Sequence, residues 1–120
     1  MKFNTTIPKR LRYYYLRELA QYRSCMRAGN FLHAWHHLER AHVIGQAYPV
    51  EHSYSHWLML KFGFEVKDFK EALGQIPRLL VGGVKSFVGQ IPTGNTGGAN
   101  VPPLRRMQIP PDIQQILKID

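Results

Sequence analysis

The sequence predicts an all-α fold, a small antiparallel array of about four helices followed by an extended tail rich in glycine and proline. Apolar residues recur at intervals of three and four along the first half of the chain, which is the spacing of one face of a helix. No stretch shows the strict alternation that is typical of a half-buried strand. Glycine, proline and asparagine stand where the periodic segments begin and end, and they divide these segments into separate helices.

The first predicted helix begins near Pro8 and ends before Gly29. Proline suits the first turn because the N–H that it lacks has no helical partner there. Glycine suits the position after the last turn because it adopts a left-handed backbone without strain. One face of this helix carries the apolar residues that we expect in the core, namely Leu11, Tyr15, Leu19, Tyr22 and Met26.

The second predicted helix runs from Phe31 to about Ala47, with Asn30 as its N-cap. It carries small Ala34 and Ala41, and together with the first helix it resembles one helix-turn-helix unit of the tetratricopeptide type. Only one such unit is visible and a solenoid needs about three, so we expect a compact hairpin array. Its inner stripe is expected to hold Phe31, Trp35, Leu38, His42 and Gly45, which places a histidine in the core.

The third predicted helix runs from about Glu51 to Phe62. Pro49 breaks the second helix before it, and Gly63 is expected to end it. A fourth helix is expected from residue 66 or 67 towards residue 81, with acidic residues near its positively polarised N-terminus.

The composition changes to proline, glycine and asparagine after about residue 90. We expect residues 1–90 to form a helical domain, and residues 91–120 to form a Gly/Pro-rich loop and tail that packs on the same domain, with one helical turn at Asp112–Leu117. The loop Gly94–Asn100 has two interpretations. It either exposes backbone N–H groups to an anion or forms a tight turn that lets the tail fold back.

The chain of 120 residues has a formal net charge of +8, so it fits one domain whose surface favours an anionic partner such as an acidic protein. Nucleic acid is disfavoured, because the second helix presents histidines and glutamate rather than a basic recognition face. A single cysteine, Cys25, and the lack of an apolar signal core predict a cytoplasmic protein. The longest apolar stretch, Ile76–Val88, is interrupted by charges, proline and glycine. Because a membrane-spanning helix needs roughly 20 apolar residues, we expect no transmembrane segment.

Histidines and a glutamate on two neighbouring helices are the chemically most promising feature. Residues three or four apart share a helix face, so Glu39 and His42 point the same way, as do His52 and His56. A short linker should pack the two helices antiparallel and set the first pair opposite the second. Three imidazoles and one carboxylate suit a single divalent transition metal, with zinc as the first choice. Water as the fourth ligand would instead allow metal-assisted hydrolysis with Glu39 as general base, so enzymatic activity is left open.

The sequence also resembles DUF3703, a bacterial family of small proteins of unknown function. The resemblance spans most of the chain from Tyr22 onward and rests on the segments HLERAHVIGQ (residues 37–46), HSYSHWLML (52–60), GQ (74–75) and GNTGGANV (94–101). It implies membership of a family but no activity.

Two functional hypotheses therefore stand side by side. The first is a metal-binding helical protein with Glu39, His42, His52 and His56 as ligands. The alternative is a non-enzymatic, tetratricopeptide-like interaction module that holds an acidic segment, in which the polar cluster only fixes the packing. In that case His42 and Glu39 hydrogen-bond to each other, to Arg40 or to Tyr54, while His52 and His56 cap and decorate the next helix. The sequence sets neither the oligomeric state nor the partner.

Overall fold

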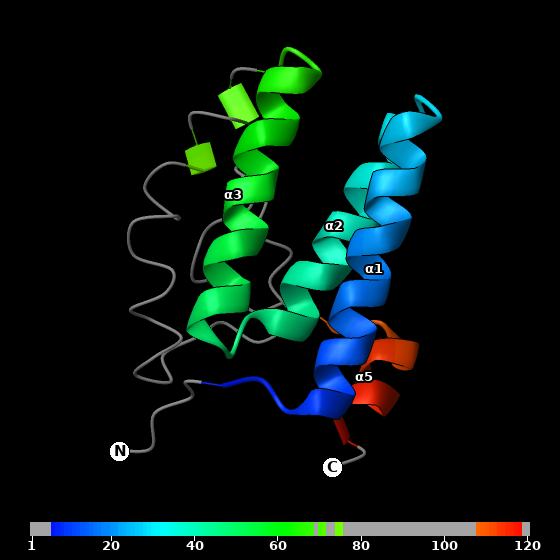
Figure 1. The fold of residues 1–120 in the computed structure, drawn as a ribbon, viewed down its shortest axis with the longest axis vertical. Helices are drawn as coiled ribbons and strands as arrows, with labels where there is room; N and C mark the ends of the chain where they lie inside the picture. Colours follow the sequence, from blue (N-terminus) through cyan, green and yellow to red (C-terminus); the bar gives the residue numbers. More distant parts are fainter. Residues whose placement is uncertain (1–5, 69, 72–73, 76–107, 119–120) are drawn as a thin grey trace.

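A computed structural model describes residues 6–68, 70–71, 74–75 and 108–118 of the chain (Figure 1). These residues hold no strand, and the prediction of an all-α fold is confirmed. None of the described helices is long and apolar enough to cross a membrane. The longer helices among the described residues are α1 (Lys9–Arg27), α2 (Phe31–Gly45), α3 (Pro49–Glu65) and α5 (Pro111–Lys118).

Residues 70–71 and 74–75 are also helical. The prediction that this fourth helix begins at residue 66 or 67 was wrong, because residues 66–67 form the turn after α3. The other residues predicted for this helix and the loop 94–100 lie outside the described residues.

The turn between α1 and α2 follows the sequence prediction. Gly29 has a φ of +72°, and the N–H groups of Asn30 and Gly29 donate to the carbonyls of Cys25 and Met26 at 2.8 and 3.1 Å. This pair of bonds is a Schellman motif, which satisfies the last carbonyls of α1. The Asn30 side chain then accepts the His33 N–H and caps α2. Both predicted boundaries are therefore confirmed.

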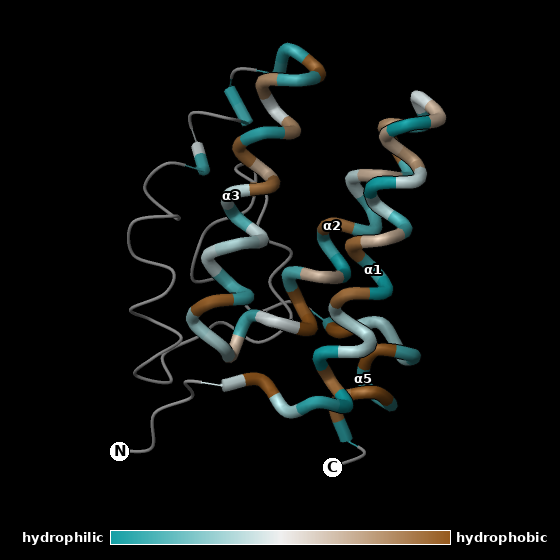
Figure 2. Tube along the Cα trace, viewed as in Figure 1, coloured by the Kyte–Doolittle hydropathy of each residue, from teal (hydrophilic) through white to brown (hydrophobic). Residues whose placement is uncertain are grey.

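The core lies mainly between α1 and α2, and hydrophobic positions recur along both helices in Figure 2. Ala34 and Ala41 are fully buried, and their small side chains let the helix backbones approach closely. Phe31 was expected on this inner stripe, but its side chain is 45% exposed, so that prediction was wrong. The alanines rather than the aromatic ring face α1. The buried hydrophobic residues of α1 and α2 are Leu11, Tyr15, Leu19, Tyr22, Ala34, Leu38, Ala41, Val43 and Ile44.

Helix α3 is longer than predicted at both ends. Pro49 is its first residue, a position where the missing N–H costs nothing. The prediction that Gly63 ends the helix was wrong, because Gly63 is buried inside it and the chain turns only at Lys67, whose φ is +62°. The Asp68 N–H donates to the Gly63 carbonyl at 2.7 Å and the Lys67 N–H donates to the Phe64 carbonyl at 3.3 Å. This is a second Schellman motif, with lysine at the position where glycine is usual.

Tyr15 connects α1 to the beginning of α3. Its hydroxyl donates to the Glu51 carbonyl at 2.9 Å and lies 3.0 Å from Ser55 Oγ. The ring passes over Gly45, where a Cβ would lie 2.9 Å from the ring edge and 2.8 Å from the Glu51 Cβ. Glycine is therefore required at this crossing for steric reasons, and the crossing fixes α3 next to the C-terminal end of α2.

Helix α5 packs on α1 and α2, with Ile113 fully buried. Arg40 of α2 bonds both to Glu18 of α1 and to Asp112 of α5, so it joins three helices. The helical turn expected at Asp112–Leu117 is confirmed by α5. The division into residues 1–90 and 91–120 stays a prediction, as does the tetratricopeptide-like character of the first hairpin.

Candidate metal centre

Three of the four predicted ligands meet in the core beside the turn between α2 and α3. His42 comes from α2, and His52 and His56 come from α3; all three side chains are buried. The Nε2 atom of His56 lies 3.1 Å from the Nε2 atom of His42 and 3.1 Å from that of His52. The three ring centroids form a nearly regular triangle with sides of 4.7 to 4.8 Å. One nitrogen of each ring thus points to a common centre.

The local sequence explains why these rings converge. His52 and His56 are four residues apart and therefore share one face of α3. His42 lies three residues before the end of α2, and His52 lies three residues after the first residue of α3. Only Gln46–Tyr48 connect the helices, so these positions come to the same depth on either side of the turn. The predicted antiparallel register therefore brings the three imidazoles together.

Glu39, the fourth predicted ligand, is half-buried one helical turn before His42. Among the described residues, the candidate ligand atoms within 4.8 Å of one another belong to the three histidines alone. Glu39 instead lines a surface hollow of about 400 Å³ with residues of the first half of α2. Farther from the turn, the rings of Trp35 on α2 and Phe62 on α3 pack against each other, with their centroids 5.0 Å apart. The role of Glu39 as a ligand stays a prediction.

The remaining histidines and the cysteine lie outside this group. His33 and His36 are exposed, and His37 is half-buried with its Nδ1 2.8 Å from a Glu18 carboxylate oxygen. Cys25 is half-buried on α1 and does not belong to the group.

Arg40 and Tyr54, two of the partners named under the purely structural alternative, contact other residues. Arg40 bonds to Glu18 and Asp112, and the Tyr54 hydroxyl accepts from Arg23 at 3.3 Å. His52 and His56 are buried in the core rather than placed on the surface of α3. Hydrogen bonds to Arg40 or Tyr54 thus do not explain why the three rings converge.

Two residues of the site, Gln75 and Glu71, were missed at the level of the sequence. Gln75 is fully buried, and its Oε1 lies 2.6 Å from His56 Nδ1. Its amide Nε2 donates to a Glu71 carboxylate oxygen at 2.6 Å. In the sequence, Gly74-Gln75 stands out only as one of the segments that resemble the family. That resemblance does not predict a contact between Gln75 and His56.

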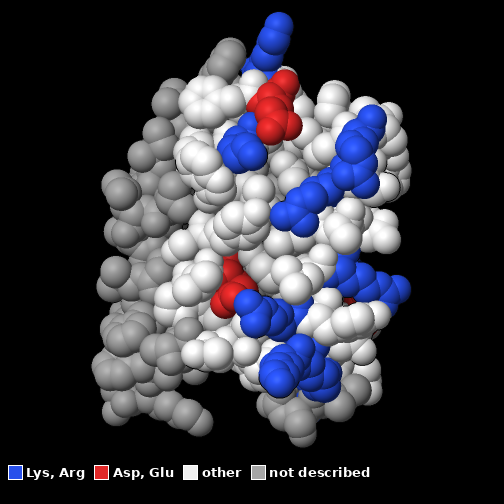
Figure 3. Space-filling model, in the orientation of Figure 1, with Lys and Arg blue, Asp and Glu red and all other residues white. Residues whose placement is uncertain are grey.

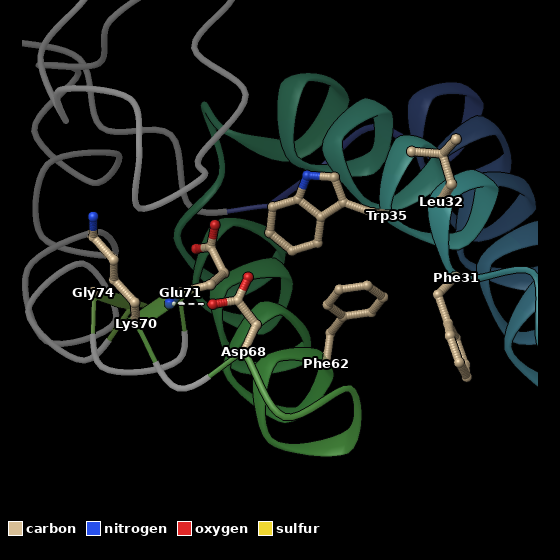
Figure 4. Close-up of a pocket in the computed structure, with 8 residues that line it drawn as sticks. All are labelled: Phe31, Leu32, Trp35, Phe62, Asp68, Lys70, Glu71 and Gly74. Atoms are coloured by element: carbon tan, nitrogen blue, oxygen red, sulfur yellow. Dashed lines mark hydrogen bonds between the residues drawn. The ribbon is translucent and has the colours of Figure 1, made fainter.

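A hollow of about 620 Å³ adjoins this chain of hydrogen bonds (Figure 4). The rings of Trp35 and Phe62 form its apolar side, and Asp68 and Glu71 form an acidic side. The Glu71 N–H donates to the Asp68 carboxylate at 3.1 Å, which is the dashed line of Figure 4. Glu71 therefore belongs both to the wall of the hollow and to the contacts that reach His56.

Comparison with known proteins places the chain in a family. A family model described as a protein of unknown function (DUF3703) matches residues 9–117. This span includes the three converging histidines, Glu39 and the pair Glu71 and Gln75. No curated protein and no solved structure matches the chain. The match covers far more than half of the sequence, and the chain therefore belongs to the DUF3703 family.

Proposed function

We propose that the protein binds one divalent transition metal ion through the Nε2 atoms of His42, His52 and His56. The observation that carries this proposal is the convergence of three imidazole nitrogens in the core. Neutral imidazole is a good ligand for zinc, copper, nickel and iron, and three histidines are a known ligand set for zinc. The proposal concerns binding alone and assigns no reaction to the site.

The spacing of the nitrogens supports this ligand set. In a tetrahedral zinc site with Zn–N distances of about 2.0–2.1 Å, two ligand nitrogens lie about 3.3 Å apart. The two Nε2 distances from His56 are 3.1 Å, so movements of a few tenths of an ångström would bring these nitrogens to the coordination distance. The backbone frame of α2 and α3 therefore already has the dimensions of such a site.

Burial of the three rings supports the same conclusion. Polar groups taken out of water need partners, and unprotonated nitrogens that face each other repel. Without a cation, one Nε2 in each of the two close contacts must carry a proton that is donated to the other. A metal ion would bond to all three lone pairs at once, which satisfies the cluster in full.

Zinc is the metal that we propose first, because a histidine-rich site suits it and no redox partner is needed. We propose either Glu39 or a water molecule as the fourth ligand. Glu39 lies one helical turn before His42 in α2. A cytoplasmic location is kept as part of this proposal, and it rests on the single cysteine of the sequence.

Elemental analysis of untagged protein, purified without chelator and then reconstituted with zinc, tests the proposal. We expect about one zinc per chain in the wild type and a loss of zinc in His42→Ala/His56→Ala. The matched control is His33→Ala/His36→Ala, which removes two exposed histidines outside the cluster. Wild-type protein without metal after reconstitution with zinc, iron, copper and nickel would overturn the proposal. A normal zinc content in Glu39→Gln would leave water as the fourth ligand.

A second proposed function, binding of an acidic protein segment, is favoured by a groove between α1 and α3. Lys and Arg side chains lie over α1 in Figure 3, beside a largely uncharged surface. The groove has a volume of about 220 Å³. Two cations, Arg12 and Arg23, and one acidic residue, Glu51, line it together with apolar Leu16 and Val50, which are 50% and 67% exposed. Apolar contacts flanked by guanidinium groups suit an amphipathic segment that carries carboxylates.

Charge reversal tests this second function. We expect Arg12→Glu/Arg23→Glu to weaken the binding of a fluorescent peptide of alternating glutamate and leucine blocks, measured by anisotropy. Lys61→Glu/Lys118→Glu makes the same change in charge at exposed positions outside the groove. Equal binding by both double variants would exclude the groove, and a zinc content that stays at the wild-type level would separate the two functions.

A further inference from the structure

The hydrogen bonds behind His56 have a polarity that can be deduced from the chemistry of Glu71. Its carboxylate, in the ionised form, can only accept hydrogen bonds. The Gln75 amide group that faces it must therefore be the NH₂ group, and the Gln75 carbonyl oxygen must face the other way, towards His56. A carbonyl oxygen only accepts, so His56 Nδ1 must carry the proton.

This polarity settles the state of the other ring nitrogen. A neutral imidazole carries one proton, so a proton on Nδ1 leaves Nε2 of His56 with a free lone pair. That lone pair points towards His42 and His52 at the centre of the cluster. The same nitrogen is the one that the proposed metal site needs.

We infer that Gln75 and Glu71 are positioning residues that hold His56 in its Nδ1–H tautomer and so direct an unprotonated Nε2 at the metal. This inference rests on the proposed metal-binding function and deepens it. Ligating histidines usually donate their second N–H to an acceptor, which fixes the ring orientation and raises the basicity of the ligating nitrogen. Here the acceptor is a fully buried amide whose own orientation is fixed by the carboxylate.

The inference also assigns the protonation of His42 and His52, the two rings that face His56, in the metal-free protein. Because Nε2 of His56 has no proton, its two contacts of 3.1 Å are hydrogen bonds only if His42 and His52 donate from their own Nε2 atoms. Metal binding then requires these two rings to give up their Nε2 protons, whereas His56 keeps its tautomer. His56 is therefore the preorganised ligand of the three.

The tautomer is measured directly by nitrogen-15 NMR of the imidazole rings in metal-free protein above the titration range of histidine. We expect a protonated Nδ1 and an unprotonated Nε2 for His56 in the wild type, and a mixture of both tautomers in Gln75→Leu. An Nε2–H tautomer of His56 in the wild type would overturn the inference, whatever the metal content.

Zinc affinity, measured by competition with a chromophoric chelator, tests the role of the pair in binding. Loss of such an outer partner typically weakens metal binding about 10- to 100-fold, and we expect Gln75→Leu to fall in this range. Gln21→Leu is the matched control at an exposed position of α1 and should bind as the wild type does. Circular dichroism and melting of the metal-free variants report whether the fold is kept.

An exchange of the two residues separates positioning from packing. In Glu71→Gln/Gln75→Glu the carboxylate at position 75 accepts the hydrogen bond from His56 Nδ1. The amide at position 71 donates to this carboxylate, so each hydrogen bond keeps the direction that leaves the proton on Nδ1. We expect this double variant to recover zinc affinity to within about threefold of the wild type. An affinity as low as that of Gln75→Leu would overturn the inference, as would a Gln75→Leu variant that binds zinc as tightly as the wild type.

Failure of the inference and failure of the proposed function are distinguishable. Wild-type protein that holds His56 as the Nδ1–H tautomer and binds no metal would overturn metal binding and support the tautomer assignment. Wild-type protein that binds zinc through a His56 insensitive to Gln75 and Glu71 would support the function and overturn the positioning role.

Discussion

His42 and His56 lie fourteen residues apart in the sequence, and their Nε2 atoms are 3.1 Å apart across the interface of α2 and α3. A ligand bound by both rings would therefore connect α2 to α3 beside the turn between these helices. Binding and folding stability are therefore coupled at this position, because a site made by two helices does not exist in the unfolded chain.

Zinc should raise the melting temperature of the wild type. A ligand that binds only the folded state stabilises it by about 2.7 kcal/mol at a free concentration of 100 times Kd. We expect this shift in calorimetry, and we expect EDTA to reverse it. In His42→Ala the shift should vanish, whereas His36→Ala should retain it. A shift of the same size in both variants would contradict binding at the cluster.

Gly45→Ala should destabilise the fold by about 1–3 kcal/mol, the usual cost of forcing a group into a packed core. The new Cβ would lie within 3 Å of both the Tyr15 ring and the Glu51 Cβ, so α1 or α3 must move. Urea unfolding gives the free-energy change. Gly29→Ala is an informative comparison, because nothing lies within 4 Å of its Cβ and only the positive φ opposes alanine. Unchanged stability of Gly45→Ala would contradict the close crossing.

Lys67→Gly should stabilise the protein by up to about 1 kcal/mol, because a left-handed backbone strains any residue with a Cβ. The same substitution at Lys61, an exposed position inside α3, should have the opposite sign and cost about 1 kcal/mol. Thermal melting of both variants measures the two effects. Equal destabilisation by both would show that α3 does not end in the left-handed turn at Lys67.

The Arg40 guanidinium lowers the pKa of the Asp112 carboxyl, chiefly through their hydrogen bond. Because the pKa of Asp112 is lower in the folded than in the unfolded chain, the ion pair stabilises the protein at pH values above the ordinary pKa of aspartate. This stabilisation is lost as the pH falls through the pKa of the folded state. We expect Asp112→Asn to be less stable than the wild type at pH 7, and the difference to close below about pH 4. Asp112 is exposed, so solvent screening limits the difference to about 0.2–1 kcal/mol. A difference that does not depend on pH would contradict the pair.

Burial raises the pKa of Tyr22 to about 12. The unfolded chain then loses its phenolic proton near pH 10 while the folded chain keeps it, so stability should decrease as the pH rises from 10 to about 12. Tyrosinate absorbance should show a late step that Tyr22→Phe reduces. Tyr13→Phe, at a ring that is 62% exposed, is the control and should leave this late step unchanged.

Local signals in the sequence were sufficient to predict most of the helical elements. Gly29 and Asn30 mark the first turn because left-handed backbone and side-chain capping depend on single residues. The convergence of His42 with His52 and His56 was also predictable, since helical spacing and a short linker fix which faces meet. The end of α3 was not, because whether Gly63 terminates a helix depends on what it packs against.

The amino-acid sequence is sufficient to predict the all-α class, the register of the α2–α3 hairpin and the three histidines at its centre. These follow from backbone geometry within one or two turns of each residue. The position of Gln75 behind His56, nineteen residues earlier in the chain, and its hydrogen bond to Glu71 became apparent only from the folded protein. Contacts of this kind depend on how segments pack in three dimensions, and the helical spacing around one short turn does not encode them.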